Sequence, residues 1–239
     1  MDRRKKYICV LDTETCPIDR TLDKVLPSNM LVYDIGYTIT DKKGNIYLKR
    51  SFLVDDIFNQ EQEKMASAYY ASKIPQYIEK IENGLIKVKS FSSIRWQLMQ
   101  DMKEFNCQTL SAHNARFDIG ALNQTARYLK KGLYYLPKDI EVWDSLKMSR
   151  DTICKNKTYQ YKTNKGFKSA TAENLYKYLS GDENFNESHT ALEDALIETK
   201  ILVKCLSSHK RMRKKLYEDW KEVEKTSFFL YWHNIKYMV

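Results

Sequence analysis

The chain has 239 residues, a formal net charge of +9 and 43% hydrophobic residues. This length allows one substantial core, so we expect one domain with elaborations. The charge permits a polyanionic partner such as nucleic acid, although a solvated lysine-rich surface gives the same balance. No apolar stretch is long enough for a membrane span, no secretory signal is recognisable, and the five scattered cysteines form no C-x-x-C pair. We therefore expect no membrane association, no zinc or redox centre, and reduced thiols in the cytoplasm.

The first predicted element is a buried strand that ends in acidic residues. Tyr7–Leu11 is a continuous β-prone apolar run of the kind found in the centre of a sheet. Asp12 follows it and Glu14 lies two residues further on, so both side chains share one face of the strand. Two ligands of one metal cluster require that arrangement, although an isolated Asp-x-Glu is usually only a strand end entering solvent.

Two more strands and a helical segment follow. The stretches 31–39 and 46–54 are β-prone and are separated by a polar turn with glycine, which predicts an antiparallel three-stranded start. From about 57 to 90 the sequence is helix-prone and rich in tyrosine. It is interrupted at Pro75 and ends at Gly84, a plausible helix stop. We predict an inserted helical pair that a minimal version of the fold does not need.

The second acidic motif is expected at the start of a helix. Apolar spacings of three and four predict a helix over 91–105, and a short strand follows over 109–112. Asn114 is a candidate N-cap, and Asp118 lies four residues later on the same side of the first turn. That turn can present a carboxylate beside Asp12.

Another short strand is predicted over 140–144, followed by a short helix over 145–150. We interpret Asp144 as the N-cap of that helix, although it could also face the site. His113 is a possible second catalytic histidine, but a structural histidine that packs the loop is the favoured interpretation.

The third motif gives the sharpest local prediction. Thr190 and Glu193 match a capping box, with Thr190 at the N-cap and Glu193 three residues later. On one continuous helix, His189 and Asp194 would be turned about 140° apart. His189 just outside the helix and Asp194 in its first turn can instead act on one substrate. The expected buried stripe of this helix is Leu192, Ala195, Leu196, Thr199, Leu202, Val203 and Leu206.

Three motifs together resemble a known family. Asp12-Thr13-Glu14, the run from His113 to Asp118, and His189 with Asp194 are similar, in order and spacing, to the motifs of the DEDDh 3'-to-5' exonuclease superfamily. That superfamily includes RNase T, oligoribonuclease and the proofreading subunit of bacterial replicative polymerases. The resemblance covers roughly residues 7 to 206. It implies an α/β, RNase H-like fold with a mixed five-stranded sheet, whose first three strands are antiparallel, flanked by helices.

The domain organisation follows from this resemblance. We expect an exonuclease domain over 1–206, with the helical insert at about 57–90 and a basic and aromatic helical extension over 207–239. The aromatic stretch 228–232 is expected to pack on the domain or on a partner, either a second copy of the chain or a replication or repair protein.

The resemblance also implies the composition of the site. Converging carboxylates repel one another unless divalent cations neutralise them, and hard oxygen ligands suit Mg²⁺ or Mn²⁺. The implied ligands of two such ions are Asp12, Glu14, Asp118 and Asp194. His189 is the implied general base that takes a proton from the attacking water, and it completes the expected catalytic set.

Three neighbours of these residues are expected to contact substrate. They are Thr13, Asn114 and Phe117. Asn114 is more safely interpreted as a helix cap, and the helical spacing of Phe117 makes core packing its default role. Thr15-Cys16-Pro17 departs from the threonine and glycine that many members have here, so the entrance to the 3'-end pocket is expected to differ.

The implied activity is metal-dependent hydrolysis of a single-stranded 3' end to nucleoside 5'-monophosphates. Discrimination between DNA and RNA rests on contacts to the sugar 2' position, which the motifs do not reveal. We place DNA slightly ahead of RNA. The first alternative is an exoribonuclease or oligoribonuclease that acts on short RNA. The same chemistry could also act on a small phosphodiester nucleotide. The alternative from a different functional class is a non-catalytic, exonuclease-like binding module.

Two basic stretches are candidate nucleic-acid contacts. Residues 155–168 interleave lysines with aromatic side chains, a combination that tracks phosphates and stacks unpaired bases. The second stretch is 210–215, beyond the catalytic core. A charge run is more often a solvated face, and this alternative holds more strongly for the second stretch.

Overall fold

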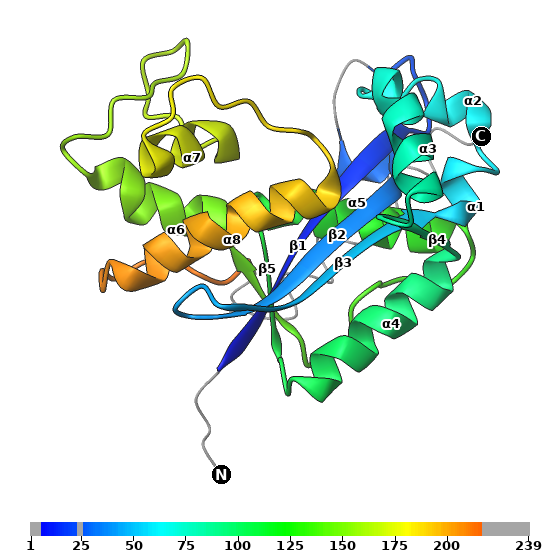
Figure 1. Cartoon of the computed structure of the whole chain (residues 1–239), viewed down its shortest axis with the longest axis horizontal. Coiled ribbons are helices and arrows are strands. Elements are labelled where there is room, and N and C mark those ends of the chain that lie inside the picture. The colour runs from blue at the N-terminus through cyan, green and yellow to red at the C-terminus, as the bar shows by residue number, and fades with distance from the viewer. Residues whose placement is uncertain (1–5, 23–25, 217–239) are drawn as a thin grey trace.

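A computed structural model of the chain describes residues 6–22 and 26–216 (Figure 1). The described residues form an α/β fold in which helices flank one mixed sheet of six strands in the order β4-β3-β2-β1-β5-β6. The strands are β1 (Tyr7–Pro17), β2 (Met30–Asp41), β3 (Ile46–Val54), β4 (Lys87–Lys89), β5 (Thr109–Ala112) and β6 (Glu141–Asp144). The main helices are α3 (Ile74–Glu82), α4 (Phe91–Glu104), α5 (Ala115–Tyr128), α6 (Ser145–Asp151), α7 (Ala172–Ser180) and α8 (Ala191–Ser207).

The sheet confirms the predicted antiparallel start and adds one strand. β1, β2 and β3 are antiparallel neighbours, and β5 and β6 continue the sheet in parallel. The sixth strand, β4, pairs in parallel with β3 inside the region predicted as a purely helical insert. The prediction of five strands missed β4 because a three-residue Lys-Val-Lys segment is too short to show the alternation of a strand.

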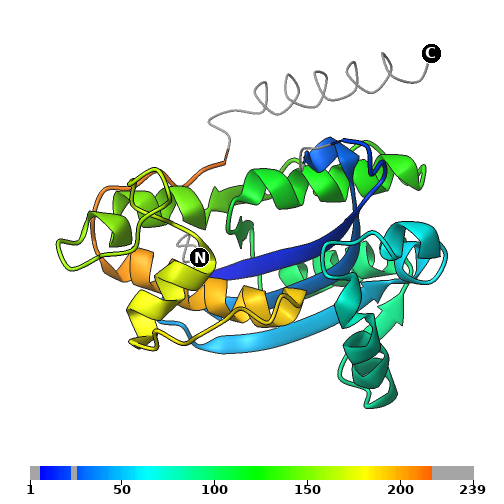
Figure 2. The same ribbon diagram turned by 90° about the horizontal axis from the view of Figure 1, so that it is seen from above.

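Alternating residues of β1 enter two separate hydrophobic cores. Cys9 and Leu11 pack in the core under α4 and α5, whereas Ile8 and Val10 pack in the core under α6, α7 and α8. This division follows from the two-residue period of a strand. Figure 2 shows α5 on one side of β1 and α8 on the other. A strand buried on both faces needs an apolar run without alternation, as the sequence has.

The insert is more finely divided than the predicted helical pair. It consists of α1 (Asp55–Phe58), α2 (Gln62–Met65), a 3-10 turn η2 (Ala71–Lys73), and α3. Pro75 lies in the first turn of α3 instead of interrupting a helix, which its missing N–H allows. Gly84 follows α3 with a φ of 68°, as expected for a glycine that ends a helix.

The buried side of α8 differs from the expected stripe. Ala195, Thr199 and Leu202 are fully buried as expected, whereas the four other expected positions are only partly buried. The additional buried residues are Ala191, Asp194, Ile197, Glu198, Ile201 and Cys205. α8 packs on the sheet and also on α6 and α7, so more than one stripe of its surface is covered.

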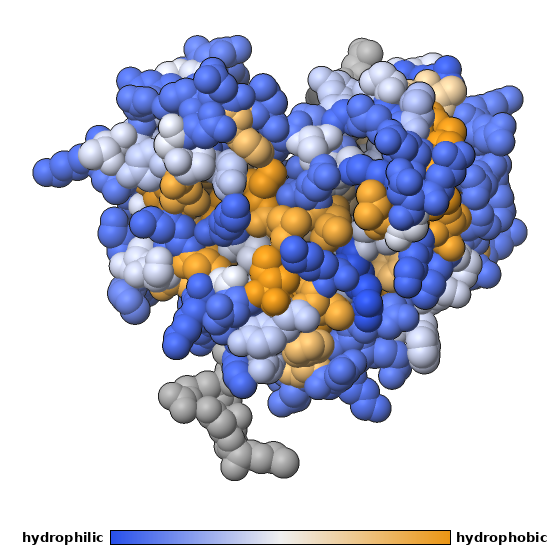
Figure 3. Space-filling model, in the orientation of Figure 1, coloured by the Kyte–Doolittle hydropathy of each residue, from blue (hydrophilic) through white to orange (hydrophobic). Residues whose placement is uncertain are grey.

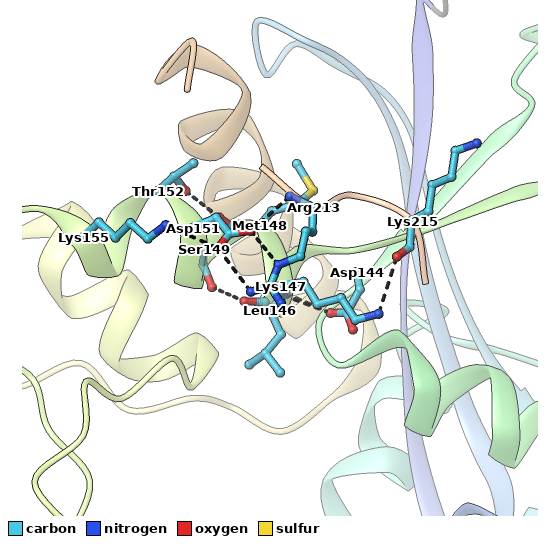
Figure 4. Close-up of polar contacts among 10 residues, drawn as sticks. All are labelled: Asp144, Leu146, Lys147, Met148, Ser149, Asp151, Thr152, Lys155, Arg213 and Lys215. Carbon is cyan, nitrogen blue, oxygen red and sulfur yellow. Dashed lines mark hydrogen bonds and ion pairs between the residues drawn. The ribbon is translucent and has the colours of Figure 1, made fainter. Parts of the chain in front are cut away.

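The stretch that follows α8 runs back along the edge of β6 (Figure 4). The amide of Asp144 donates to the Lys214 carbonyl at 2.8 Å, and Arg213 forms an ion pair with Asp151 at 2.9 Å. Residues 208–216 form no helix, so the expected helical extension does not begin at 207. Because Arg213 is paired with Asp151, part of the positive charge of the basic run 210–215 is neutralised within the protein.

The remainder of the expected extension, residues 217–239, lies outside the described residues together with its aromatic stretch. Within the described ranges, no helix is both long enough and apolar enough to cross a membrane. All five cysteines are buried, and the cytoplasmic location stays a prediction.

Candidate active site

The second half of β1 carries two acidic residues on one face. Asp12 pairs with Gly36 of β2 and Glu14 pairs with Asp34, after which the register shifts between Glu14 and Thr15. By the alternation of the strand, Asp12 and Glu14 point to the side that α8 covers. Thr13 points to the opposite side, where its hydroxyl donates to Asp118 at 2.9 Å.

The second motif lies at the start of α5, where Asn114 occupies the N-cap position as predicted. Its side chain makes no capping hydrogen bond, and its backbone is left-handed with a φ of 68°. The Asp144 carboxylate instead accepts from the Asn114 amide at 3.3 Å and caps α6 through Leu146 and Lys147. The prediction of the cap position was right for both residues, but the side chain that satisfies the backbone is that of Asp144.

The third motif lies at the start of α8. Thr190 is the N-cap, but its hydroxyl donates to the Glu193 carboxylate at 2.8 Å instead of forming the capping-box bonds to the backbone. His189 precedes the helix with a left-handed φ of 51°, and Asp194 lies in the first turn. The expected separation of His189 from the helix is confirmed.

A glycine on β2 brings α8 close to Asp12. A Cβ atom on Gly36 would lie 2.0 Å from the backbone nitrogen of Leu192 and 2.1 Å from the carbonyl carbon of Ala191. No side chain fits at that distance, so the first turn of α8 touches the sheet directly. Because Gly36 is the strand partner of Asp12, this contact places Asp194 beside the acidic end of β1.

All eight residues predicted for the site line one pocket of about 710 Å³. Its walls come from two sides of the molecule: Tyr70 from the insert, and residues 163 and 168–171 from the loop before α7. Figure 1 shows the insert and the α6–α7 region on opposite sides of the start of α8, and the surface is notched between them in Figure 3. Segments far apart in the sequence thus meet at one opening.

The carboxyl groups in this pocket have strongly raised pKa values. Burial, followed by the charges of Glu198 and Asp118, raises the pKa of Asp12 well above its usual range. Burial and the charge of Asp34 raise the pKa of Glu14 to about 9. Burial raises the pKa of Asp118 to about 7, and burial with the charge of Glu187 raises that of Asp194 to about 7. Carboxylates that suppress one another's ionisation in this way are suited to binding a cation.

The donor atoms present fit a hard divalent cation. One ligand atom from each of Glu14, His189 and Asp194 lies within 4.8 Å of the others. Oδ1 of Asp194 is buried and has no hydrogen-bond partner among the described residues, so it is available to a ligand. Asp12 and Asp118 line the same pocket and add further oxygen atoms.

Sequence reasoning missed a further carboxylate. Glu198 lies one turn after Asp194 on α8, is 3% exposed, and lines the pocket. It accepts a hydrogen bond from the His113 amide at 3.1 Å, and burial together with the charges of Asp118 and Asp194 raises its pKa well above the usual range. The spacing of four residues from Asp194 is the signal that could have found it. Arg150, Glu187 and Tyr70 also line the pocket without having been predicted.

His113 has the geometry of a structural residue. Its Nε2 atom donates to the Ala170 carbonyl at 2.7 Å, and its Nδ1 atom accepts from the Ser145 hydroxyl at 2.9 Å. Burial lowers the pKa of the ring, which favours the neutral form with one donor and one acceptor. The two ring nitrogens therefore connect the loop before α7 to the start of α6.

Comparisons with known proteins found a family model and solved structures that resemble this chain. Residues 87–202 match the RNase T family model, described as "Exonuclease". The structure resembles the zinc-bound complex of Escherichia coli exonuclease I with single-stranded DNA, with a TM-score of 0.53 and 14% identity over 87% of this chain and 42% of that one. It also resembles the complex of E. coli exonuclease I with a dT13 oligonucleotide, with a TM-score of 0.52 and 16% identity over 83% and 40%. At these identities the likeness shows the fold.

The present chain spans less than half the length of those solved structures. No curated protein matches it.

Proposed function

Because this chain belongs to the DEDDh 3'-to-5' exonuclease superfamily of nucleases, we propose that it hydrolyses single-stranded nucleic acid from the 3' end to nucleoside 5'-monophosphates. The observation that carries the proposal is the convergence of the three motifs, from β1, α5 and the start of α8, on one pocket. A pure binding module has no use for buried carboxylates that repel one another and a phosphate backbone. The proposal therefore places chemistry, and not binding alone, at this site.

The proposed metal ligands are Asp12, Glu14, Asp118 and Asp194, with Mg²⁺ or Mn²⁺ as the ion and two ions as the expected number. When bound, such a pair polarises the phosphate and lowers the pKa of water. The protein supplies the positions: Gly36 lets Asp194 approach Asp12, and Thr13 orients Asp118 by donating to it.

His189 is the proposed general base. It lies outside α8, is 30% exposed, and has its pKa lowered by burial and by the nearby charge of Lys73. A lowered pKa keeps the ring neutral near pH 7, so that it can accept a proton from the attacking water. The leaving group is the 3' oxygen of the penultimate nucleotide, and the phosphate stays on the released nucleoside 5'-monophosphate.

The proposed path of the strand follows the loop before α7. Arg150, Thr163 and Lys168 line both the active-site pocket and an adjoining pocket, where Phe167 is 71% exposed. Cations beside an exposed aromatic ring suit a phosphate backbone with unpaired bases. Lys168 is also a structural residue, since its Nζ atom donates to the carbonyls of Asn156 and Tyr159. Asn114, whose side chain is exposed and does not cap α5, and Phe117 are the proposed contacts to the terminal nucleotide.

Single-stranded DNA is the substrate proposed first, because the solved structures with this fold include complexes with single-stranded DNA. The exonuclease unit is proposed to span 1–206, and the segment from 207 onward is proposed to bind a second copy of the chain or a replication or repair protein.

The test uses end-labelled single-stranded DNA, single-stranded RNA, duplex DNA and a dinucleotide, each with Mg²⁺, Mn²⁺ or EDTA. We expect shortening from the 3' terminus with release of mononucleotides, dependent on the ion. Asp12→Asn and His189→Ala should abolish it while circular dichroism remains that of the wild type. Preference for RNA or the dinucleotide would select the short-RNA alternative, and binding without cleavage under all conditions would contradict the proposal.

A further inference from the structure

The segment that carries His189 is contacted by the helical insert. The ring of Tyr70 stacks on the His189 imidazole, with 4.3 Å between centroids and 14° between planes. The Lys73 ammonium donates to the carbonyl of Ser188, the residue before His189, and also lies 4.9 Å from the centre of the Tyr70 ring. One side chain thus holds the imidazole face, and another holds the backbone leading to it.

Two more insert residues fix the start of α8. The Tyr77 hydroxyl donates to Oδ2 of Asp34 at 2.8 Å, and the same oxygen accepts from the Ala191 amide at 3.0 Å. Lys80 forms an ion pair with Glu193 at 3.2 Å. These contacts extend the row from the loop into the first helical turn.

The contacting residues 70, 73, 77 and 80 are spaced by three, four and three. They therefore lie on one face of the helical segment formed by η2, whose N-cap is Tyr70, and α3. That face is directed at residues 188–193. The insert therefore packs on the residues that lead into α8 and on the first turn of that helix.

His189 needs such support. Its backbone is left-handed, a conformation that residues with a Cβ atom rarely adopt, and it lies outside the hydrogen-bonded frame of α8. Its side chain is 30% exposed, and a carboxylate oxygen of Glu187 lies 3.9 Å from Nδ1, beyond hydrogen-bond distance. Neither helix geometry nor deep burial fixes the ring, so contacts from the insert remain to set its orientation.

We propose that Tyr70 and Lys73 are positioning residues that hold the His189 imidazole in the orientation in which it accepts the proton. This inference rests on the proposed function of His189. It assigns to the insert, which a minimal exonuclease domain does not need, a direct part in the geometry of the reaction.

Tyr70 also borders a second pocket of about 500 Å³ that includes Phe117 and Leu22. An aromatic ring there can stack on a nucleobase. The test must therefore distinguish positioning of His189 from binding of a base.

The discriminating substrate is bis(4-nitrophenyl) phosphate, a phosphodiester without a nucleobase. For Tyr70→Leu, we expect kcat to fall about ten- to hundredfold on this ester and on single-stranded DNA, with KM nearly unchanged, because misplacement of a reacting group costs rate. Tyr70→Phe keeps the stacking face and should retain wild-type kcat. Tyr47→Leu, the same change at an exposed position on β3, is the matched control and should retain wild-type activity.

Lys73→Met should lower kcat in the same way, and Lys73→Arg should recover part of it. A Tyr70→Leu variant that raises KM for DNA alone and hydrolyses the ester normally would show base binding and overturn the inference.

A readout independent of activity is the NMR signal of the His189 ring C–H groups. Tyr70→Leu should move this signal by removing the stacked ring and should leave the His113 signal in place. An unmoved His189 signal would overturn the inference whatever the activity. Loss of the proposed function looks different, because the wild-type protein would then cleave neither substrate in Mg²⁺ or Mn²⁺.

Discussion

The two halves of the site are built differently. The acidic half lies on β1, α5 and α8, where strand pairing, two cores and the backbone contact at Gly36 fix the carboxylates. The other half consists of His189 and the loop before α7. It lies at the surface and is fixed by single side-chain contacts, such as the stacking of Tyr70 on His189. The carboxylates are therefore positioned by the fold itself, whereas the base and the substrate path are positioned by elaborations on it.

The sharpest way to break the acidic half is to neutralise Asp12. Asp12→Asn should lower kcat about a thousandfold or more, because a metal site supplies several kcal/mol of transition-state stabilisation. The same change removes repulsion from Glu198 and Asp118, so without metal the variant should melt at a higher temperature than the wild type. Nuclease assays and thermal melting in EDTA measure the two effects. A lower melting temperature would contradict the proposed repulsion.

The close packing of α8 on β2 can be broken at Gly36. Gly36→Ala introduces a Cβ atom against the backbone of Leu192, so we expect a loss of about 1–3 kcal/mol of folding stability as α8 shifts. Activity should fall because Asp194 moves away from Asp12. Urea denaturation and the Mg²⁺ concentration that gives half-maximal activity measure these changes. Wild-type values for both would show that the contact does not position the site.

The pH dependence of stability tests the acidic half as a unit. The pKa values of Glu14, Asp118 and Asp194 are raised in the folded protein to about 9, 7 and 7. In the unfolded chain these groups lose their protons near pH 4. Between those limits the folded state binds more protons, so without metal the free energy of unfolding decreases as the pH rises.

Melting temperatures in EDTA should therefore fall between about pH 5 and pH 8, and added Mg²⁺ or Mn²⁺ should stabilise the protein more at the higher pH, where the ligands are ionised. A stabilisation by metal that does not depend on pH would argue against binding by these carboxylates. Asp12→Asn is the control, and added metal should raise its melting temperature less than that of the wild type.

The smallest expected effect concerns the substrate path in the surface half. Arg150→Met should raise KM for single-stranded DNA about three- to tenfold, leave kcat unchanged, and reduce the salt dependence of binding by about one phosphate contact. Lys42→Met removes the same charge at the turn between β2 and β3 and is the matched control. A fall in kcat without a change in KM would place Arg150 in the chemistry instead.

Much of the acidic half could be predicted from local sequence. The run Tyr7–Leu11 specifies a central strand, and the two-residue period places Asp12 and Glu14 on one face. Thr190 marks the start of α8, which correctly separates His189 from Asp194. These features depend on interactions between near neighbours in the chain, and such interactions leave a pattern.

Other residues could not be found in this way. In the sequence, Glu198 cannot be told apart from an exposed charge on a helix, and only the packing of α8 places it in the pocket. Tyr70 is one of 17 tyrosines in the chain, and no local pattern distinguishes it from the others. The cap of α5 was assigned to Asn114 because Asn is a good capping residue, but the Asp144 carboxylate from another strand satisfies its amide. In each case the partner lies far away in sequence.

The sequence by itself determined the order of β1, β2, β3, β5 and β6 with α4, α5, α6 and α8. It also determined the three acidic motifs and the placement of His189 outside a helix, because these follow from periodicity and capping within a few residues. Only the tertiary structure decided that the motifs share one pocket, that Glu198 joins them, and that the insert reaches His189. Those contacts join residues separated by up to about 190 positions, and they exist only when chain folding brings the ends of β1, α5 and α8 together.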